Sequence, residues 1–389
     1  MKPSITRLIH DEWQDLKRCH PGRSWIALHF GEPDLGTPDF IVEAGCRALR
    51  QGAVFYEDNS GRADLKRELV EHHRRHDHAH LVPENFVITC GGTQAIMLTM
   101  LAVLSPGDDV INVTPAWPNF TEAARIAGAT VHELPLTFVP EQGTFELDFA
   151  ELESTFRRCL QPRLIIVNSP SNPTGWIMSE SQKCQLYDFC REHDVLLLAD
   201  EIYDRIVFVD HPSSSFLTLD EGSDRLIIIN GFSKVYAMTG WRVGYLIAPA
   251  DLAAKMARMQ EFLTSHAPSM AQVAAITALR EGESYVAASV HRYRRLRRVA
   301  LNQLGSIPGS TVARPDGSIY VFFRLPGSDD SLAFCRDLLA QSGVVLAPGR
   351  AFGRGGESWL RLCIANEEAV LCQAIDRIGG FLTQQGHKS

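Results

Sequence analysis

The chain has 389 residues, of which 45% are hydrophobic and 22% are charged, and its formal net charge is −8. This length favours two packed units over one simple core, and the composition is that of an ordinary globular protein. A negative net charge argues against a general nucleic-acid or membrane-surface function, because both functions require a basic surface.

The ends of the chain and its cysteines bear on where the protein works. No apolar run is long enough to span a bilayer, and the first residues, MKPSITRLIHDEWQDL, lack the apolar core of a secretory signal. The nine cysteines are an odd number and form no CxxC pair. Free thiols in a reducing compartment are the simplest interpretation, so we expect a cytoplasmic protein.

Seven short β-branched runs alternate with segments of helical spacing. The runs are FVIT (86–89), DVINV (109–113), TVHEL (130–134), RLIIVN (163–168), VLLLAD (195–200), LIIIN (226–230) and GYLIA (244–248). Near-continuous apolar runs are typical of strands buried on both faces, whereas residues 93–104 and 181–193 have helical spacing. The order predicts an α/β fold whose large domain holds a mostly parallel seven-stranded sheet covered by helices.

The pattern changes toward the C-terminus. Residues 284–304 predict a long helix with a basic solvent face, and shorter strands follow at 317–325 and 359–365 before a terminal helix. These elements predict a smaller α+β domain. We expect three parts: an N-terminal segment that packs with the small domain (1–44), a large cofactor-binding domain (45–275) and a small C-terminal domain (276–389).

Residues 71–80, EHHRRHDHAH, contain five histidines, and His72 and His76 would share one face of a helix. A metal site would need a fuller set of ligands, and no cysteine or ordered carboxylate completes a coordination shell there. We expect a solvated helix end at this position and assign no metal site from the sequence.

Glycines, prolines and an asparagine follow two of the predicted strands. In parallel α/β sheets, ligands bind beyond the carboxyl ends of the strands. Residues 91–93, Gly-Gly-Thr, open a helix after the first strand, which suits either a phosphate site or a tight turn. The loop SPSNPTG (169–175) follows the fourth strand, and its two prolines fix the backbone around Asn172.

Charged residues follow the next two strands. Asp200 ends an apolar strand, so its carboxylate should be buried and should need a cationic partner. Lys234 lies between two apolar strands, eight residues before Arg242, where burial would lower the pKa of its amine and make it a nucleophile. A lysine that forms an imine, a carboxylate that keeps a ring nitrogen protonated, and a phosphate cradle together predict pyridoxal 5'-phosphate as cofactor.

These motifs also identify a family. The sequence resembles the class I aminotransferases, the aspartate aminotransferase-like group of fold-type I pyridoxal-phosphate enzymes. The resemblance covers nearly the whole chain, through GEPDLGTP, YEDNSGRADLK, GGTQA, SPSNPTG, DEIY, SKVYAMTGWRVGY and WLRLCIA. It implies a transferase of nitrogenous groups that moves an amino group between an L-amino acid and a 2-oxo acid by a ping-pong mechanism. It also implies a homodimer with shared active sites.

The resemblance implies catalytic roles for individual residues. Lys234 would bind the cofactor covalently and shuttle a proton, and Asp200 would pair with the ring nitrogen. Tyr203 and Asn172 would hydrogen-bond the phenolate oxygen, and Trp117 would stack on the ring. Tyr203 and Trp117 could instead be ordinary core aromatics.

The resemblance implies binding roles for a second group of residues. The phosphate would be held by Gly92, Thr93, Ser233 and Arg242, with Tyr56 reaching in from the neighbouring subunit. Arg361, together with Asn172 and the backbone of Gly31, would hold the substrate α-carboxylate, unless Arg361 only forms a strand-end ion pair. The family often has a serine three residues before the lysine, a position that is Gly231 here.

Three alternatives and one question of substrate stay open. A β-lyase or a cyclising synthase shares this fold. A pyridoxal-phosphate-binding regulator would need an added DNA-binding domain, whereas the chain is expected to begin with the catalytic unit. Dicarboxylate-specific relatives use a second arginine, and residues 264–275 contain none, so a strict aspartate preference is not expected. The N-terminal segment and residues 346–353 should line the side-chain pocket.

Overall fold

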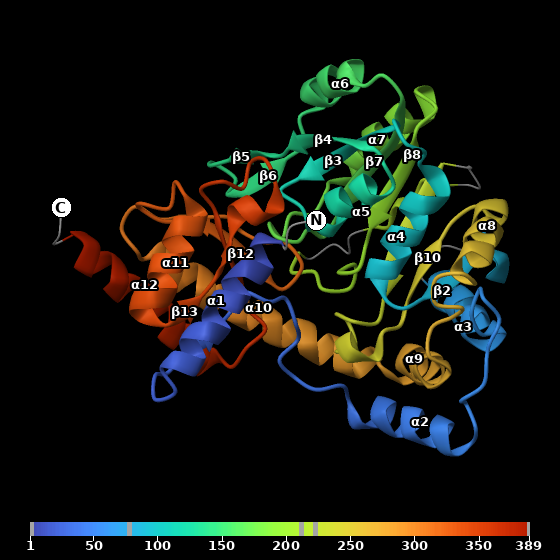
Figure 1. Cartoon of the computed structure of the whole chain (residues 1–389), viewed down its shortest axis with the longest axis horizontal. Helices are drawn as coiled ribbons and strands as arrows, with labels where there is room; N and C mark the ends of the chain where they lie inside the picture. Colours follow the sequence, from blue (N-terminus) through green and yellow to red (C-terminus); the bar gives the residue numbers. More distant parts are fainter. Residues whose placement is uncertain (1–3, 76–79, 210–213, 221–224, 387–389) are drawn as a thin grey trace.

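The computed structural model describes residues 4–75, 80–209, 214–220 and 225–386, and Figure 1 shows how their helices and strands are arranged. Its main feature is a seven-stranded sheet in the order β2-β10-β9-β8-β7-β3-β4. The strands are β2 Phe86–Thr89, β3 Asp109–Thr114, β4 Thr130–Pro135, β7 Pro162–Asn168, β8 Leu196–Asp200, β9 Leu226–Gly231 and β10 Gly244–Ile247. Only β10 runs antiparallel to its neighbours, so the prediction of a mostly parallel seven-stranded sheet is confirmed.

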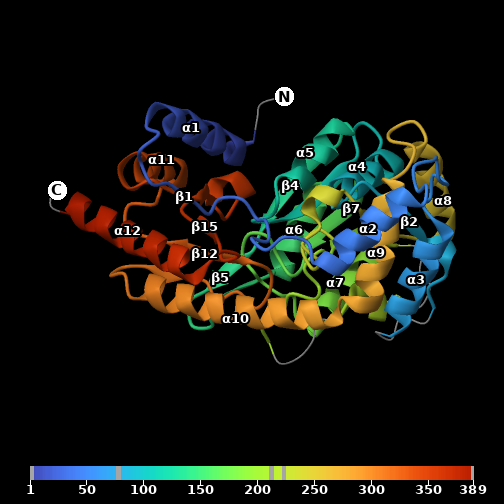
Figure 2. The ribbon, with the colours of Figure 1, turned by 90° about the horizontal axis from the view of Figure 1, so that it is seen from below.

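Helices cover both faces of this sheet, as the near-continuous apolar runs predict. Within β9, Ile227 and Ile229 belong to one core cluster and Ile228 to the other, because successive side chains of a strand point to opposite faces. The first cluster contains residues of α4, α5 and α8, and the second contains residues of α3, α7 and α9 (Figure 2).

The helices have the following bounds: α1 Ile5–Cys19, α2 Asp39–Arg50, α3 Ala63–Arg74, α4 Gly92–Val103, α5 Asn119–Ile126, α6 Phe149–Arg158, α7 Glu180–Glu192, α8 Ala250–Gln260, α9 Ser269–Glu281, α10 Glu283–Gly305, α11 Ser331–Ser342 and α12 Glu368–Gly386. Among these described helices, none has both the length and the apolar character needed to cross a bilayer. The predicted helices at 93–104, 181–193 and 284–304 correspond to α4, α7 and α10 within one residue at each end.

A second, four-stranded antiparallel sheet has the order β11-β12-β15-β14. The remaining strands are β1 Ile26–Ala27, β5 Thr137–Val139, β6 Thr144–Glu146, β11 Thr311–Val312, β12 Tyr320–Arg324, β13 Val344–Val345, β14 Ala347–Pro348 and β15 Leu360–Cys363. Helix α1 packs on α11, and β1 pairs with β13, so the start of the chain lies against its last quarter (Figure 1).

The predicted division into 1–44, 45–275 and 276–389 stays a prediction. Its two boundaries fall inside α2 and α9, and these helices pack against each other. Helix α10 follows α9 directly and also contacts β12 of the smaller sheet, so one continuous helix connects the two parts (Figure 2).

The expected solvated helix end at the histidine-rich segment is wrong for the histidines on α3. His72 and His73 are buried, and Nε2 of His73 lies 3.3 Å from the hydroxyl of Tyr245 on β10, because this end of α3 packs against the sheet. His76 and His78 lie outside the described residues.

Candidate active site

A cavity of about 380 Å³ lies at the carboxyl ends of β7, β8 and β9, where the two parts of the molecule meet. It brings together almost every residue for which the sequence predicted a role. Its walls include Gly31, Gly92, Thr93, Trp117, Asn172, Asp200, Tyr203, Ser233, Lys234, Arg242 and Arg361. The exception is Tyr56, which is 90% exposed and whose ring contacts His266 outside the cavity.

Lys234 lies three residues after β9, and its amine points across the cavity. Nζ donates a hydrogen bond to the carbonyl oxygen of Gly31 at 2.5 Å. Burial lowers the pKa of the amine to about 8. About a tenth of the amine is therefore neutral at pH 7, far more than for an ordinary lysine, and the neutral form is the one that acts as a nucleophile or a base.

Asp200 ends β8, and its side chain is almost completely buried. Oδ1 accepts a hydrogen bond from the backbone N–H of Ile202 at 3.0 Å, but the carboxylate forms no ion pair with any described residue. Burial consequently raises its pKa to about 7. The cationic partner expected from the sequence is therefore not a side chain of the described chain, and a cationic group in the cavity would satisfy it.

Tyr203 has a partner that the sequence did not reveal. Its hydroxyl oxygen lies 2.8 Å from that of Tyr320, and both side chains are buried. Tyr320 lies on β12, inside the predicted strand 317–325, where an aromatic residue is also typical of an ordinary core position. No motif distinguishes such a tyrosine from a packing residue until the two sheets are brought together.

Arg361, on β15, is buried and only partly satisfied. Nη1 donates to Oδ1 of Asn172 at 2.7 Å, and Nη2 donates to the backbone carbonyl of His29. The guanidinium lies 4.3 Å from the ring centroid of Tyr320, and Nε has no hydrogen-bond partner. No described carboxylate pairs with Arg361, so the alternative of a strand-end ion pair does not hold among the described residues, and its guanidinium brings an unneutralised positive charge to the cavity wall.

An anion cradle forms where α4 begins. Gly91 has a φ of +81°, and a Cβ there would lie 2.6 Å from Nη2 of Arg242, so glycine is required for this close approach. Nη2 of Arg242 donates to the carbonyl of Cys90 at 3.0 Å and Nη1 donates to that of Thr239 at 2.7 Å. These bonds hold the guanidinium beside the unpaired N–H groups of the helix start, which together favour a bound anion.

Packing explains why residue 231 is a glycine. Gly231 pairs with Gly244 across β9 and β10, and a Cβ at residue 231 would lie 2.9 Å from the Cα of Gly244. A serine cannot fit at this position without separating the two strands. Ser233 is the serine that lines the cavity instead.

The mouth of the cavity contains residues to which the sequence assigned no individual role. The start of α1 contributes Ser4, Thr6 and Arg7 to this mouth. Phe30 lines it from the segment after β1, and Phe352 lies in the wall from the segment 346–353. Arg7 forms no ion pair with a described residue, and its guanidinium lies 5.7 Å from the ring centroid of Phe30. The start of α1 thus adds a positive charge to the cavity.

Comparisons with known proteins show the family to which the chain belongs. A sequence model of the family "Aminotransferase class I and II" matches residues 23–378. The bifunctional aspartate aminotransferase and glutamate/aspartate-prephenate aminotransferase of Petunia hybrida is 36% identical over 97% of this chain and 80% of its own length. Both matches extend over the motifs that line the cavity.

Solved structures give the same answer. A single mutant of Thermus thermophilus aspartate aminotransferase superposes with a TM-score of 0.90 at 32% identity, covering 98% of this chain and 97% of that one. The aromatic aminotransferase of Pyrococcus horikoshii OT3 superposes with a TM-score of 0.88 at 30% identity, covering 96% and 99%. The chain therefore belongs to the class I and II aminotransferases, enzymes that transfer an amino group between an amino acid and a 2-oxo acid.

Proposed function

We propose that this aminotransferase uses pyridoxal 5'-phosphate held in the cavity at the ends of β7, β8 and β9. The observation that carries the proposal is the meeting, in one cavity, of the Lys234 amine, the unpaired carboxylate of Asp200 and the Arg242 cradle. Each of these matches one part of the cofactor: its aldehyde, its ring nitrogen and its phosphate. When bound, the cofactor supplies an aldehyde that condenses with amines and a ring that withdraws electrons.

The phosphate end would be held by backbone and side-chain donors together. The N–H groups at the start of α4, with Thr93, Ser233 and Arg242, offer charge-assisted hydrogen bonds to a dianion. Asp200 would hold the ring nitrogen in its cationic form, because a buried carboxylate gains from a cationic partner. Trp117 lies in the cavity wall, where its indole would stack on the ring.

The chain's own residues would then orient the substrate and move its proton. The guanidinium of Arg361 would bind the α-carboxylate, while Asn172 and the His29 carbonyl hold it in the cavity wall. The Lys234 amine, with its lowered pKa, would take the α-proton and return it. Tyr203, hydrogen-bonded to Tyr320, would donate to the phenolate oxygen of the cofactor.

The cofactor proposal is tested by borohydride reduction of the purified protein. The cofactor should become fixed to Lys234, and peptide mapping should find the label there. Lys234→Ala should still bind cofactor through the phosphate cradle but lose turnover almost completely. A label on another residue, or none, would refute the proposal.

Transfer, rather than lyase or cyclase chemistry, is supported by the names of the relatives, which are aminotransferases. An amino acid alone should release one equivalent of 2-oxo acid per active site, with further turnover requiring an added oxo-acid acceptor, as a ping-pong cycle demands. Steady release of ammonia without an acceptor would indicate a lyase instead.

For the substrate, we propose a dicarboxylic amino acid whose distal carboxylate is bound by Arg7. Support comes from the names of the relatives, which include aspartate aminotransferases, and from the positive charge at the cavity mouth without a carboxylate partner among the described residues. Arg7 would play the part of the second arginine that residues 264–275 lack.

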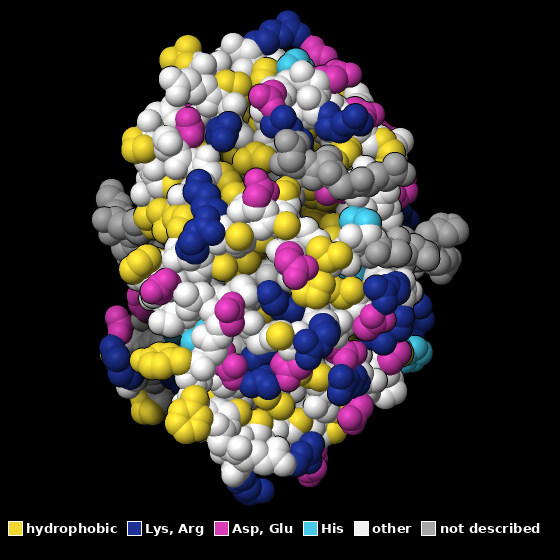
Figure 3. Space-filling model, turned by 90° about the vertical axis from the view of Figure 1, so that its right-hand side faces the viewer, with side chains coloured by type: hydrophobic (Ala, Val, Ile, Leu, Met, Phe, Trp, Pro, Cys, Tyr) yellow, Lys and Arg dark blue, Asp and Glu magenta, His cyan; other side chains and the backbone are white. Residues whose placement is uncertain are grey.

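We also propose that the active unit is a homodimer. Large hydrophobic side chains are exposed at Leu49, Val54, Phe55, Tyr56, Phe262 and Leu263. Two segments carry them, and these lie side by side, because Oγ of Ser269 donates to the carbonyl of Phe55 at 3.0 Å and Asn59 contacts Glu261. Figure 3 shows the side of the molecule that carries α8 and α3, on which hydrophobic side chains lie among charged ones. A second copy that covers this patch would contact Tyr56, the residue that the family resemblance assigns to the neighbouring cradle.

A reducing, cytoplasmic location remains part of the proposal. All nine cysteines lie in the described part of the chain and are free thiols, and Cys19, Cys46 and Cys184 are exposed. Exposed thiols of this kind persist where disulfides do not form.

A further inference from the structure

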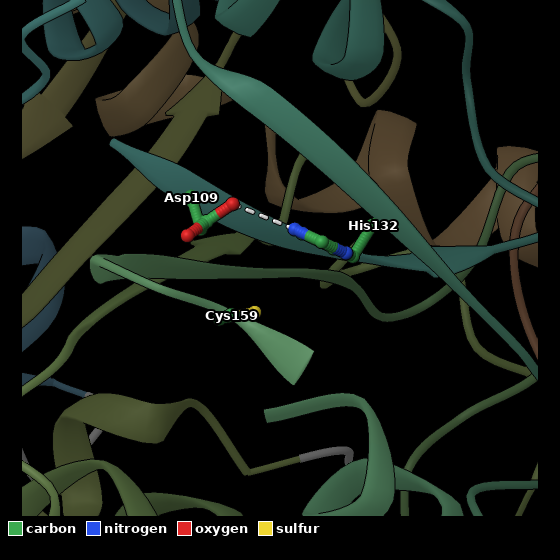
Figure 4. A group of neighbouring side chains, drawn as sticks. All are labelled: Asp109, His132 and Cys159. Atoms are coloured by element: carbon green, nitrogen blue, oxygen red, sulfur yellow. Dashed lines mark hydrogen bonds and ion pairs between the residues drawn. The ribbon is translucent and has the colours of Figure 1, made fainter. Parts of the chain in front are cut away.

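Three potential metal ligands lie together at the opposite end of the large sheet from the active-site cavity. Asp109 is the first residue of β3, His132 is the third residue of β4, and Cys159 follows the last residue of α6 (Figure 4). Each residue offers one ligand atom, and these three atoms all lie within 4.8 Å of one another. The register places Thr130 opposite Asp109, so His132, two residues further along, faces the same side of the sheet.

Asp109 is held as a metal ligand would be held. Its side chain is only 7% exposed, and Oδ2 accepts hydrogen bonds from the N–H groups of Leu160 and Gln161 at 2.7 and 2.8 Å. Oδ1 lies 2.7 Å from Nε2 of His132. No described lysine or arginine pairs with this carboxylate. Backbone donors therefore fix Oδ2 and leave Oδ1 beside Nε2 of His132, which is how outer-shell bonds orient a coordinating carboxylate.

We propose that Asp109, His132 and Cys159 bind one zinc-type divalent cation, with water as the fourth ligand. Tetrahedral zinc with usual bond lengths places such donors about 3.3 to 3.6 Å apart, so Oδ1 and Nε2, now 2.7 Å apart, would separate by about 0.6 Å, and Sγ, within 4.8 Å of both, lies close to the required range. One carboxylate, one imidazole and one thiol form a mixed set that favours zinc over calcium or magnesium, which prefer oxygen alone.

The chemistry of binding balances without another reactant. The thiol of Cys159 donates a hydrogen bond to the carbonyl of Thr155, one turn back, at 3.5 Å, and a thiol is a weak donor. On binding, the thiol proton passes to solvent and the thiolate takes the cation. The hydrogen that Nε2 of His132 donates to Asp109 is released to solvent while Nδ1 takes one up, so that neutral imidazole binds through Nε2, and the hydrogen bond is replaced by two metal bonds. His132 is 23% exposed, so a water ligand can reach the ion.

The site would be structural rather than catalytic. None of its three ligands lines the active-site cavity, which is formed at the carboxyl ends of the strands, whereas Asp109 begins β3. A cation here would tie the connection between α6 and β7 to two neighbouring strands. Binding should therefore raise thermal stability and leave turnover unchanged.

The test is a titration of the cofactor-loaded enzyme with Co²⁺ and Zn²⁺. We expect one equivalent of Co²⁺ to produce a new thiolate-to-cobalt absorption band over the cobalt-free spectrum. Zn²⁺ should raise the unfolding midpoint and a chelator should reverse the rise. Cys159→Ser and His132→Gln should each weaken binding by a factor on the order of 100.

Two controls separate this site from other ligands in the chain. Cys184→Ser removes an exposed thiol on α7 and should leave the band and the stabilisation intact. A double variant, His76→Gln with His78→Gln, removes side chains of the histidine-rich segment, which contains no cysteine, and should also leave the thiolate band intact. The proposal is overturned if the wild type takes up no cation, or if uptake and band are the same in Cys159→Ser.

Discussion

Replacing Gly31 by alanine tests how tightly the substrate end of the cavity is built. A Cβ at Gly31 would lie 1.5 Å from the hydroxyl oxygen of Tyr320 and 2.4 Å from its Cζ. Ordinary contact begins near 3.4 Å, so the loop and the ring must separate by about 2 Å. Tyr320 is buried on β12, so the adjustment falls largely on the loop.

The same loop carries two functional contacts. The carbonyl of Gly31 accepts the hydrogen bond from the Lys234 amine, and the carbonyl of His29, two residues earlier, accepts one from Arg361. A displacement of about 1 Å at such a position lowers the rate by roughly 100-fold, and overpacking destabilises the fold by about 1–3 kcal/mol. We therefore expect kcat/KM for the amino donor to fall about 100-fold.

The measurement is steady-state kinetics of the amino-donor half of the cycle, with thermal unfolding as a check on the fold. Gly36→Ala is the matched control, because it lies in the same segment and a Cβ there meets nothing within 4 Å. Adding Tyr320→Phe to Gly31→Ala should not restore activity, since Cζ remains in the way. A Gly31→Ala enzyme within twofold of the Gly36→Ala enzyme would refute the argument.

Three further predictions concern residues around the cavity and the exposed patch. Tyr320→Phe keeps the ring but removes the hydroxyl that forms a hydrogen bond with Tyr203. A lost hydrogen bond costs about 1 kcal/mol, so kcat/KM should fall about fivefold, and circular dichroism should show an unchanged fold. Arg7→Leu should lower kcat/KM for aspartate by about 10-fold or more and leave that for phenylalanine nearly unchanged; equal losses for both donors would contradict a role in carboxylate binding. Phe262→Ser removes an aromatic side chain that is 84% exposed in the single chain and whose burial in a dimer would be worth about 2 kcal/mol. The dimer dissociation constant measured by sedimentation should therefore rise at least about 10-fold, and an unchanged constant would place the interface elsewhere.

The sequence predicted the large sheet well because its strands carry a signal of their own. Runs such as Leu226–Ile229 are apolar at every position, and only a strand covered on both faces needs that pattern. The same reasoning located the cavity in advance, since parallel strands present their carboxyl ends at one edge of a sheet. The residues that follow β8 and β9, Asp200 and Lys234, therefore meet there.

Two residues that reach the cavity from other parts of the chain were not predicted individually. Tyr320 and Arg7 come from β12 and α1, and neither lies in a motif that distinguishes it from a core aromatic or a surface arginine. Asp109, His132 and Cys159 are likewise separated along the chain, so no spacing pattern connects them. Their proximity depends on the register between neighbouring strands. The apolar pattern of a strand shows which face of the sheet each residue is on, but it does not show which residue of the next strand lies opposite.

The backbone contacts around Arg361 show why the start of the chain matters to an active site built mostly from its middle. Nη2 of Arg361 donates to the carbonyl of His29, and the ring of His29 lies 3.1 Å from that of His10 on α1, measured between Nε2 and Nδ1. Burial lowers the pKa of His29 to about 3, so its ring stays neutral near neutral pH and the pair can share a single N–H. The arginine proposed to hold the substrate carboxylate is thus positioned through α1, which also supplies Arg7 to the cavity mouth. A carbonyl oxygen carries no side-chain signal, and this connection therefore becomes visible only when α1 is packed against the small sheet.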